Sequence, residues 1–119
     1  MHELALAQRV AHAALEALAG LDPPPRRVVR TVVVAGRLHQ IVPDFLTRAF
    51  GYCVEGTPAQ GSGLDLEIVP VTARCPACGW TGEIEPPWFV CGDCGRPGVE
   101  VRTGKEFYLD RLEVERDDD

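Results

Sequence analysis

The sequence predicts an α+β fold, in which a small three-stranded sheet packs with two helices and carries an inserted zinc-ribbon-like lobe with a four-cysteine site. Two segments repeat apolar residues at helical spacing, and three others are rich in β-branched or alternating apolar residues, as strands are. Two C-x-x-C pairs lie between the second and third of these strand patterns. A chain of 119 residues with 45% hydrophobic residues has the size and composition of one domain with a core of its own.

Residues 4–18 are predicted to form the first helix. Their apolar side chains recur at spacings of three and four residues, with polar side chains on the opposite side. The helix must end before Asp22, because the three prolines that follow cannot continue it. A second helix is predicted to start at Pro43, a residue favoured in the first turn, and to end near Gly56 with Cys53 on its apolar side.

Three segments are predicted to form strands. Residues 26–35 are rich in β-branched side chains, as expected of a mostly buried strand. Residues 64–69 alternate apolar with polar side chains, and Pro70 directly after them suits an edge strand or a bulge. Residues 107–114 also alternate, but the apolar phase changes near Asp110, which predicts a one-residue slip in the last strand.

The composition changes sharply between residues 74 and 104. This segment holds four of the five cysteines, both tryptophans and four of the ten prolines. We therefore expect residues 1–73 and 105–119 to form one α/β domain and residues 74–104 to form an inserted metal-binding domain.

Charge and hydropathy exclude several classes of function. Twelve basic residues against eighteen acidic ones give a net charge of −6, which argues against a nucleic-acid partner because phosphate binding needs positive surface. The apolar runs are far shorter than the roughly 20 residues needed to cross a bilayer. The chain begins Met1-His2-Glu3, without the basic segment of an export signal. We expect a cytoplasmic protein that has no membrane partner.

The two C-x-x-C pairs, Cys75 with Cys78 and Cys91 with Cys94, are twelve residues apart and can present four thiolates to one tetrahedral ion. Thiolate ligands select zinc over magnesium or calcium, and a site filled by four cysteines is structural because no position is left for water. A redox dithiol is disfavoured because neither pair precedes a helical pattern, whereas the spacing alone leaves iron open. Cys53 is expected to pack in the core as a small apolar residue.

The amino terminus is a second candidate metal site. The α-amine of Met1, the backbone nitrogen of His2 and the His2 imidazole can close adjoining chelate rings around Ni(II) or Cu(II). Glu3 can add a further ligand, or it can stabilise the positive end of the first helix. A histidine at position two also occurs in chains that bind no metal, and both interpretations remain open on these residues alone.

Taken in order along the chain, the motifs resemble the HypA/HybF family of hydrogenase maturation nickel metallochaperones. The resemblance extends over essentially the whole chain. It rests on Met1-His2-Glu3-Leu4, Val34-Ala35-Gly36, Val42-Pro43-Asp44-Phe45-Leu46, Ala49-Phe50, Gly56-Thr57-Pro58, the two cysteine pairs and Gly104-Lys105-Glu106.

The resemblance implies a metal-binding protein that is not an enzyme. It would bind Ni(II) as transient cargo and help deliver it to the large-subunit precursor of nickel-iron hydrogenase, together with a HypB-type GTPase. The implied nickel ligands are Met1, His2 and, as ligand or support, Glu3. The implied ligands of a structural Zn(II) are Cys75, Cys78, Cys91 and Cys94.

The alternative interpretation is a zinc-ribbon protein-interaction module without nickel function. In that case Trp80, Trp88 and Phe89 would be adhesive residues, although they could simply cover a lobe with little core. His12 and His39 match no family motif and are expected to be solvated. A catalytic role is disfavoured because the sequence has no ordered pair of nucleophile and base. The sequence leaves a monomer, a homodimer and exchange of elements between copies open.

Overall fold

The computed structural model describes residues 2–117. The chain divides into two compact units, which are described separately. Unit 1 comprises the chain up to Val34, Ile41–Glu67 and the chain from Tyr108 onward, and unit 2 comprises Ala35–Gln40 and Ile68–Phe107. The inserted unit thus begins several residues before the composition changes and also takes in a short segment from the first half of the chain.

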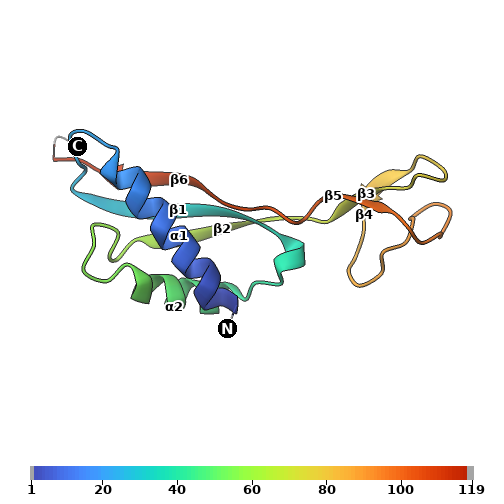
Figure 1. The fold of residues 1–119 in the computed structure, drawn as a ribbon, viewed down its shortest axis with the longest axis horizontal. Coiled ribbons are helices and arrows are strands. Elements are labelled where there is room, and N and C mark those ends of the chain that lie inside the picture. The colour runs from blue at the N-terminus through green and yellow to red at the C-terminus, as the bar shows by residue number, and fades with distance from the viewer. Residues whose placement is uncertain (1, 118–119) are drawn as a thin grey trace. The chain divides into compact units, whose positions relative to one another are not determined.

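Unit 1 contains the helices α1 and α2 and a three-stranded sheet (Figure 1). The elements are α1 (His2–Ala19), β1 (Arg27–Gly36), α2 (Pro43–Cys53), β2 (Gly63–Val69) and β6 (Phe107–Glu115). The last two residues of β1 and of β2 and the first residue of β6 are assigned to unit 2. The strand order is β2-β1-β6. β1 and β2 run in the same direction and β6 runs opposite to them (Figure 1). α2 therefore lies on the crossover between two parallel strands.

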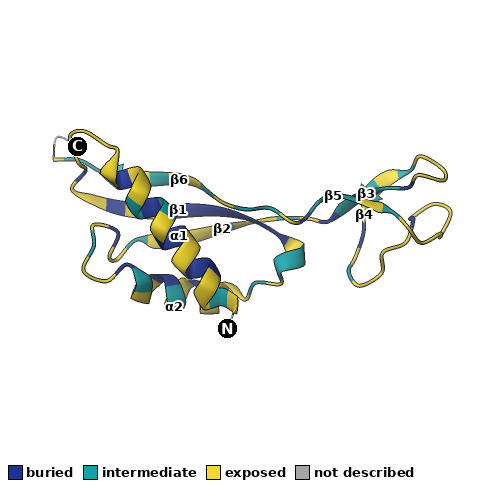
Figure 2. Cartoon of the chain, viewed as in Figure 1, coloured by how far each residue is buried: buried dark blue, intermediate teal, exposed yellow. Residues whose placement is uncertain are grey.

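The apolar core of unit 1 lies between the helices and one face of this sheet. α1 buries a stripe that includes Leu6, Val10 and Leu18, while α2 buries Leu46 and Phe50. The central strand β1 is buried along most of its length (Figure 2). This is the burial expected of helices with one apolar side that cover a central strand rich in valine.

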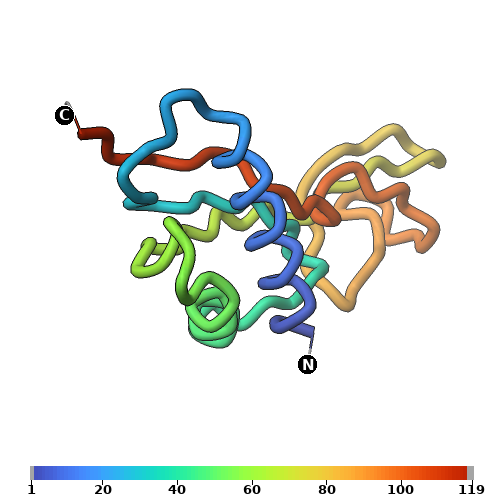
Figure 3. The backbone as a smooth tube through the Cα atoms, turned by 60° about the vertical axis from the view of Figure 1, so that its left-hand side comes forward, coloured from blue at the N-terminus to red at the C-terminus, as the bar shows by residue number. Residues whose placement is uncertain are grey.

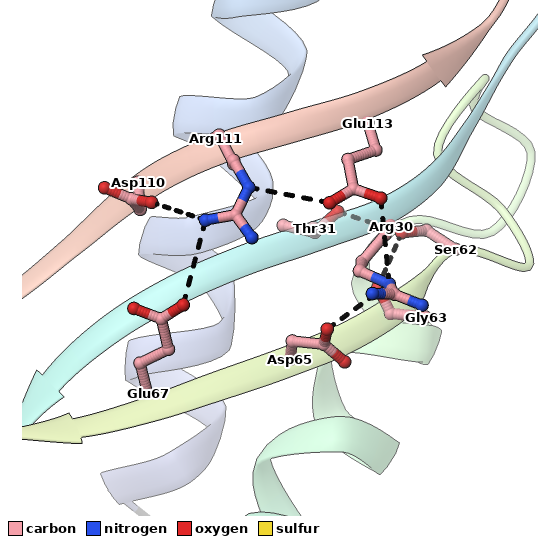
Figure 4. Close-up of polar contacts among 9 residues, drawn as sticks. All are labelled: Arg30, Thr31, Ser62, Gly63, Asp65, Glu67, Asp110, Arg111 and Glu113. Carbon is pink, nitrogen blue, oxygen red and sulfur yellow. Dashed lines mark hydrogen bonds and ion pairs between the residues drawn. The ribbon is translucent and has the colours of Figure 1, made fainter.

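The opposite face of the sheet carries a network of charged side chains (Figure 4). Arg30 on β1 lies 3.3 Å from Asp65 on β2 and 4.0 Å from Glu113 on β6. Arg111 on β6 lies 3.7 Å from Glu67 and 3.5 Å from Glu113. The helices lie behind the sheet in this view, so one face of the sheet is apolar and covered, and the other is charged.

Unit 2 contains a short turn of 3-10 helix, η1 (Arg37–His39), and a second sheet of three short strands. The strands are β3 (Thr72–Arg74), β4 (Thr81–Glu83) and β5 (Glu100–Thr103), in the order β4-β3-β5. β3 pairs antiparallel with both neighbours, and its register with β5 shifts between Thr72 and Ala73. The small core consists of three buried residues, Val71, Ala73 and Ile84. Four partly buried residues pack on them, namely Leu38, Trp80, Val99 and Val101.

Two glycines bring distant backbone segments of unit 2 into contact. A Cβ on Gly36 would lie 2.0 Å from the carbonyl of Gly104, which leaves no room for a side chain. Gly104 itself has φ of +117°, in the region that favours glycine. The Gly36 N–H donates to the Glu106 carbonyl at 2.6 Å, and the Leu38 N–H donates to the Gly104 carbonyl at 2.9 Å. Backbone contact therefore fixes η1 against the segment that follows β5.

The predicted fold class is confirmed, with two helices and three long strands in the predicted places. The half-buried positions of β6 change phase between Asp110 and Arg111, as the sequence pattern indicated. The second sheet was not anticipated, although Val71, Ala73 and Cys75 alternate inward along the chain. Within residues 2–117, no helix is both long and apolar enough to span a bilayer.

Candidate metal centre

The two C-x-x-C pairs meet at one point in unit 2. The Sγ atoms of Cys75, Cys78, Cys91 and Cys94 all lie within 4.8 Å of one another. Cys75 Sγ is 3.8 Å from Cys94 Sγ, and Cys78 Sγ is 3.5 Å from Cys91 Sγ. These distances are too long for disulfides and leave room for an ion between the four sulfurs.

Both pairs are held by the same kind of turn. In the first, the Cys75 carbonyl accepts the Gly79 N–H at 2.8 Å, and the Cys75 N–H donates to the Trp80 carbonyl at 2.8 Å. Gly79 takes a positive φ of 81°, which a residue with a side chain rarely adopts. The chain therefore reverses directly after Cys78, so that both sulfurs of the pair face the same side.

The second pair repeats this pattern sixteen positions later. The Cys91 carbonyl accepts the Gly95 N–H at 3.1 Å, the Cys91 N–H donates to the Arg96 carbonyl at 2.9 Å, and Gly95 has φ of 73°. In addition, the backbone N–H groups of Asp93 and Cys94 donate to Cys91 Sγ at 3.3 and 3.2 Å. Donors of this kind partly neutralise thiolate charge, and metal–thiolate sites depend on such outer contacts.

The sulfurs differ in their acidity. Burial by itself raises the pKa of the Cys91 thiol, but the N–H groups of Cys94 and Asp93 together with the Cys78 thiol lower that pKa to about 6. Cys78 shows the reverse, because the Trp80 N–H lowers its pKa whereas the neighbouring Cys91 sulfur and burial raise it, to about 12. Four sulfurs in such proximity cannot all carry negative charge without a cation to offset it.

The arrangement fits zinc. A tetrahedral ion bonded to four sulfurs at about 2.3 Å places those sulfurs about 3.8 Å apart, close to the two cross-pair distances in this site. All four ligand positions would be taken by cysteine, and Cys75 and Cys91 are buried. The residues would thus hold a metal in a closed, sulfur-only site, which is a structural role.

Trp80 packs over the backbone beside this site. A Cβ on Gly82 would lie 2.6 Å from the Trp80 ring, and a Cβ on Gly92 would lie 2.5 Å from it. The indole therefore rests on Gly82 of β4 and on Gly92 in the turn of the second cysteine pair, and it also packs on the small core of unit 2. The interpretation that Trp80 covers a small core is confirmed. Trp88 behaves differently, because 70% of it is exposed.

The N-terminal candidate lies in unit 1, at the start of α1. His2 Nδ1 lies 3.3 Å from Glu3 Oε1, with 48% of the His2 side chain and 14% of the Glu3 side chain exposed. The other Glu3 oxygen, Oε2, accepts the backbone N–H of Val42 at 3.1 Å. This bond holds the pKa of the Glu3 carboxyl below its ordinary value. Met1 lies outside the described residues.

Val42 precedes the first residue of α2, so the Glu3 contact joins the beginnings of both helices. Figure 3 shows the segment that enters α2 passing beside the first turn of α1. Sequence reasoning placed Glu3 at the start of a helix but could not find this partner, because Val42 lies 39 positions along the chain.

The other histidines and the fifth cysteine lie away from these sites. His12 is confirmed as solvated, with 76% of its side chain exposed beside Glu16 on α1. His39 is only partly solvated, because its ring lies edge-on to Phe107 and its Nε2 is 2.9 Å from the Lys105 carbonyl oxygen. Cys53 is half-buried at the end of α2.

Comparison with known proteins decides the family. The family described as "Hydrogenase/urease nickel incorporation, metallochaperone, hypA" matches residues 1–114. The chain belongs to the HypA family. The resemblance noted in the sequence is thereby confirmed. The four-cysteine cluster therefore belongs to a member of a nickel metallochaperone family for hydrogenase maturation.

Relatives within the HypA family are similar over their full length. The hydrogenase maturation factor HypA of Nostoc sp. is 33% identical over 115 residues, which cover 97% of this chain and 96% of that protein. The hydrogenase maturation factor HypA of Chlorobium limicola is 32% identical over 118 residues, which cover 99% of this chain and all of that protein.

Solved HypA structures share the fold. The solution structure of the nickel metallochaperone HypA from Helicobacter pylori gives a TM-score of 0.66 at 21% identity, covering 98% of this chain and 100% of that one. A second solution structure, of a HypA protein, gives a TM-score of 0.61 at 22% identity and covers 96% of each chain. The arrangement of two helices, a sheet and a cysteine lobe is therefore the HypA fold.

Proposed function

We propose that this chain is a nickel metallochaperone that binds Ni(II) at its amino terminus and helps deliver it to the large subunit of nickel-iron hydrogenase during maturation. Membership of the HypA family over residues 1–114 carries this proposal, because that family is described by nickel incorporation. In this proposal the four cysteines bind a zinc ion that stabilises the fold of unit 2 and takes no part in nickel transfer.

The start of α1 supports nickel binding by the Met1 amine, the His2 backbone nitrogen and the His2 imidazole. α1 begins at His2, and the first N–H groups of a helix have no acceptor within the helix. Nickel can therefore replace the proton on the His2 backbone nitrogen without breaking a helical hydrogen bond. About half of the His2 side chain is exposed, so the imidazole is accessible to an ion from solvent.

Glu3 is assigned a supporting role in this site. One carboxylate oxygen already accepts the Val42 N–H, and the other faces His2 Nδ1. The chelate ring between the His2 backbone nitrogen and its own imidazole closes through Nδ1, so nickel would displace the Glu3 oxygen from that atom. Glu3 supports the site by fixing the helix start to which the ligands belong, through its bond to Val42. Glu3→Gln is expected to weaken nickel binding without abolishing it.

In this proposal nickel and zinc are bound by two different parts of the chain. Residues 1–73 and 105–119 form the nickel-binding domain, and residues 74–104 form the zinc-binding domain. The partners are a HypB-type GTPase and the hydrogenase large-subunit precursor, and the chain works in the cytoplasm by binding and transfer, without catalysis. It is expected to show no affinity for nucleic acid at physiological salt.

Calorimetric titration with Ni(II) tests the site. Zinc-loaded protein without a tag should bind nickel, whereas protein extended before Met1 and the His2→Ala variant should not, because each loses a nitrogen ligand. His12→Ala is the matched control, since His12 is solvated and belongs to neither site. Equal affinity with and without the extension would defeat the N-terminal site and leave the zinc-ribbon interaction module, with exposed Trp88, as the better account.

Nickel binding should also be labile to acid. The imidazole, the α-amine and the His2 backbone nitrogen must each lose a proton to bind the metal, so protons compete with nickel for all three ligand atoms. Nickel affinity should therefore fall as pH is lowered, which repetition of the titration at each pH measures.

A further inference from the structure

An apolar groove lies on the surface of unit 1 between α1 and α2. It has a volume of about 270 Å³ and is lined by Leu4 of α1 and by Phe45, Arg48, Ala49 and Tyr52 of α2. The three large apolar residues are well exposed, with 40% of Leu4, 56% of Phe45 and 73% of Tyr52 accessible. Phe45, Ala49 and Tyr52 are spaced by four and three residues, so they form one stripe along α2.

Arg48 places a positive charge in this groove that no acidic side chain in the described part of unit 1 pairs with. The other arginines of the unit each have an ion pair or another polar contact, namely Arg9, Arg26, Arg27, Arg30, Arg111 and Arg116. Among residues 2–117, Arg48 makes no ion pair, even though Asp44 lies one turn earlier on the same helix. An exposed guanidinium beside exposed aromatic rings is complementary to a partner that brings apolar side chains and a carboxylate together.

We propose that this groove docks an amphipathic helix that carries a carboxylate, contributed by the protein that exchanges nickel with the amino terminus; this inference rests on the proposed function. Both walls of the groove are helices, and a third helix can lay its apolar side along them with anchors at intervals of three and four residues. The carboxylate of that helix pairs with Arg48, and its apolar residues cover Phe45 and Tyr52.

The position of the groove matches this role. Leu4 follows Glu3 directly and belongs to the first turn of α1, so an occupant in contact with Leu4 lies within one turn of His2. The opposite face of the same unit is unsuited to docking, because its charges already pair with one another across three strands (Figure 4). Apolar exposure and unpaired charge thus coincide where nickel is proposed to bind.

Binding measurements with purified HypB-type GTPase and purified hydrogenase large-subunit precursor test the proposal. Arg48→Glu and Tyr52→Ala should each weaken binding to one of these proteins by about tenfold or more, because central aromatic and arginine contacts dominate interfaces. Tyr108→Ala is the matched control, since Tyr108 is an exposed tyrosine on β6 of the same unit, with 50% of its surface accessible. Its affinity should stay within about twofold of the parent protein.

Two further measurements identify the occupant. A photoreactive benzoylphenylalanine in place of Tyr52 should cross-link to a helical segment that contains Asp or Glu, and mass spectrometry of the product locates it. Reversing that acidic residue to Arg in the partner should restore binding to Arg48→Glu. Absence of binding by both proteins, unchanged affinity in both variants, or a cross-link to a second copy of this chain would each overturn the proposal.

Failure of the groove and failure of the nickel site are distinguishable. Arg48→Glu and Tyr52→Ala should keep the nickel affinity of the parent, because neither residue is a ligand. Partner binding is measured without nickel as well as with it. Loss of partner binding with nickel titration unchanged supports the groove, whereas a parent protein that binds the partner but no nickel contradicts the proposed function alone.

Discussion

The two units are stabilised in different ways. Unit 1 buries most of the largest side chains that are fully inaccessible in the structure, including Phe50, Leu46, Val28, Val32 and Val33. Unit 2 buries only three residues in its apolar cluster, with four partly buried ones around them. Each fully buried large apolar side chain contributes about 1.5–3 kcal/mol to the free energy of unfolding. The core of unit 1 is therefore large enough to stabilise a folded domain, whereas the core of unit 2 is too small to do so alone.

This difference explains why the closed metal site belongs to unit 2. A structural zinc ion contributes apparent free energy of about 10–16 kcal/mol in small domains, far more than three small side chains supply. The proposed nickel site lies on unit 1, which can keep its shape whether or not an ion is bound. The proposed function thus places transient cargo on the unit that does not need metal in order to fold.

Removal of two cysteines is expected to have the largest effect on one unit alone. Cys75→Ala combined with Cys94→Ala should abolish zinc binding and unfold unit 2, because the lobe loses ligands from both turns. Unit 1 should stay folded on its own core. Zinc content per chain and amide NMR spectra of the two units measure the outcome, and full zinc content in the double variant would refute the metal site.

Truncation of the core of unit 1 should have the complementary effect. Phe50 is 1% exposed, and Phe50→Ala should lower the free energy of unfolding of unit 1 by about 3–5 kcal/mol. Zinc content should not change. Urea unfolding followed at residues of each unit measures both effects, and Phe45→Ala is the control because Phe45 is 56% exposed. Simultaneous loss of zinc would show that the units are not independently stabilised.

A methyl group at Gly36 should destabilise unit 2, because it would separate two backbone segments that are in contact. Gly36→Ala places a Cβ against the Gly104 carbonyl, and the backbone must move at a cost of about 1–3 kcal/mol. Gly51→Ala is the matched control, because a Cβ there meets no atom within 4 Å and α2 is continuous through this position. That control should gain about 0.5–1 kcal/mol. Thermal unfolding of zinc-loaded proteins compares the two, and an unchanged midpoint for Gly36→Ala would contradict the close approach.

Protonation of Glu106 in acid should lower the stability of unit 2 by a small amount. Its own N–H and the Gly104 N–H donate to the carboxylate, at 2.7 Å in the case of Gly104, and lower its pKa from 4.5. A lowered pKa means that the stabilisation is complete above about pH 4.5 and is lost as pH falls further. Glu106→Gln should show a shallower loss of stability in that range. Loss of zinc would itself unfold unit 2, so the denaturant midpoints of the two proteins are compared only down to the lowest pH at which both keep their full zinc content.

The sequence predicted those features that depend on local spacing. Periodicity located α1, α2 and the three long strands, and the repeated C-x-x-C spacing brought four sulfurs together because each turn closes over only a few residues. Gly79 and Gly95 follow Cys78 and Cys94 directly in the sequence, and their positive φ values show that they close these two turns.

Features that depend on contacts between distant segments could not be read from the sequence. His39 looked solvated because its partner, the Lys105 carbonyl, lies 66 positions away. The Glu3 bond to Val42, the approach of Gly36 to Gly104 and the groove beside Arg48 are of the same kind. Each arises only when elements that pack for other reasons bring these residues within reach.

The charged network on the sheet also bears on the solubility of the protein. β2 and β6 are the edge strands of their sheet, and an unpaired edge can recruit a strand from another molecule. β2 carries Asp65 and Glu67 and no basic residue, and β6 carries three acidic residues against the single Arg111. Both edge strands are therefore net negative, and two copies that approach edge to edge bring like net charges together. Salt screens such repulsion beyond about 10 Å at 0.1 M ionic strength. Concentrated protein should therefore resist edge-to-edge aggregation best in dilute buffer.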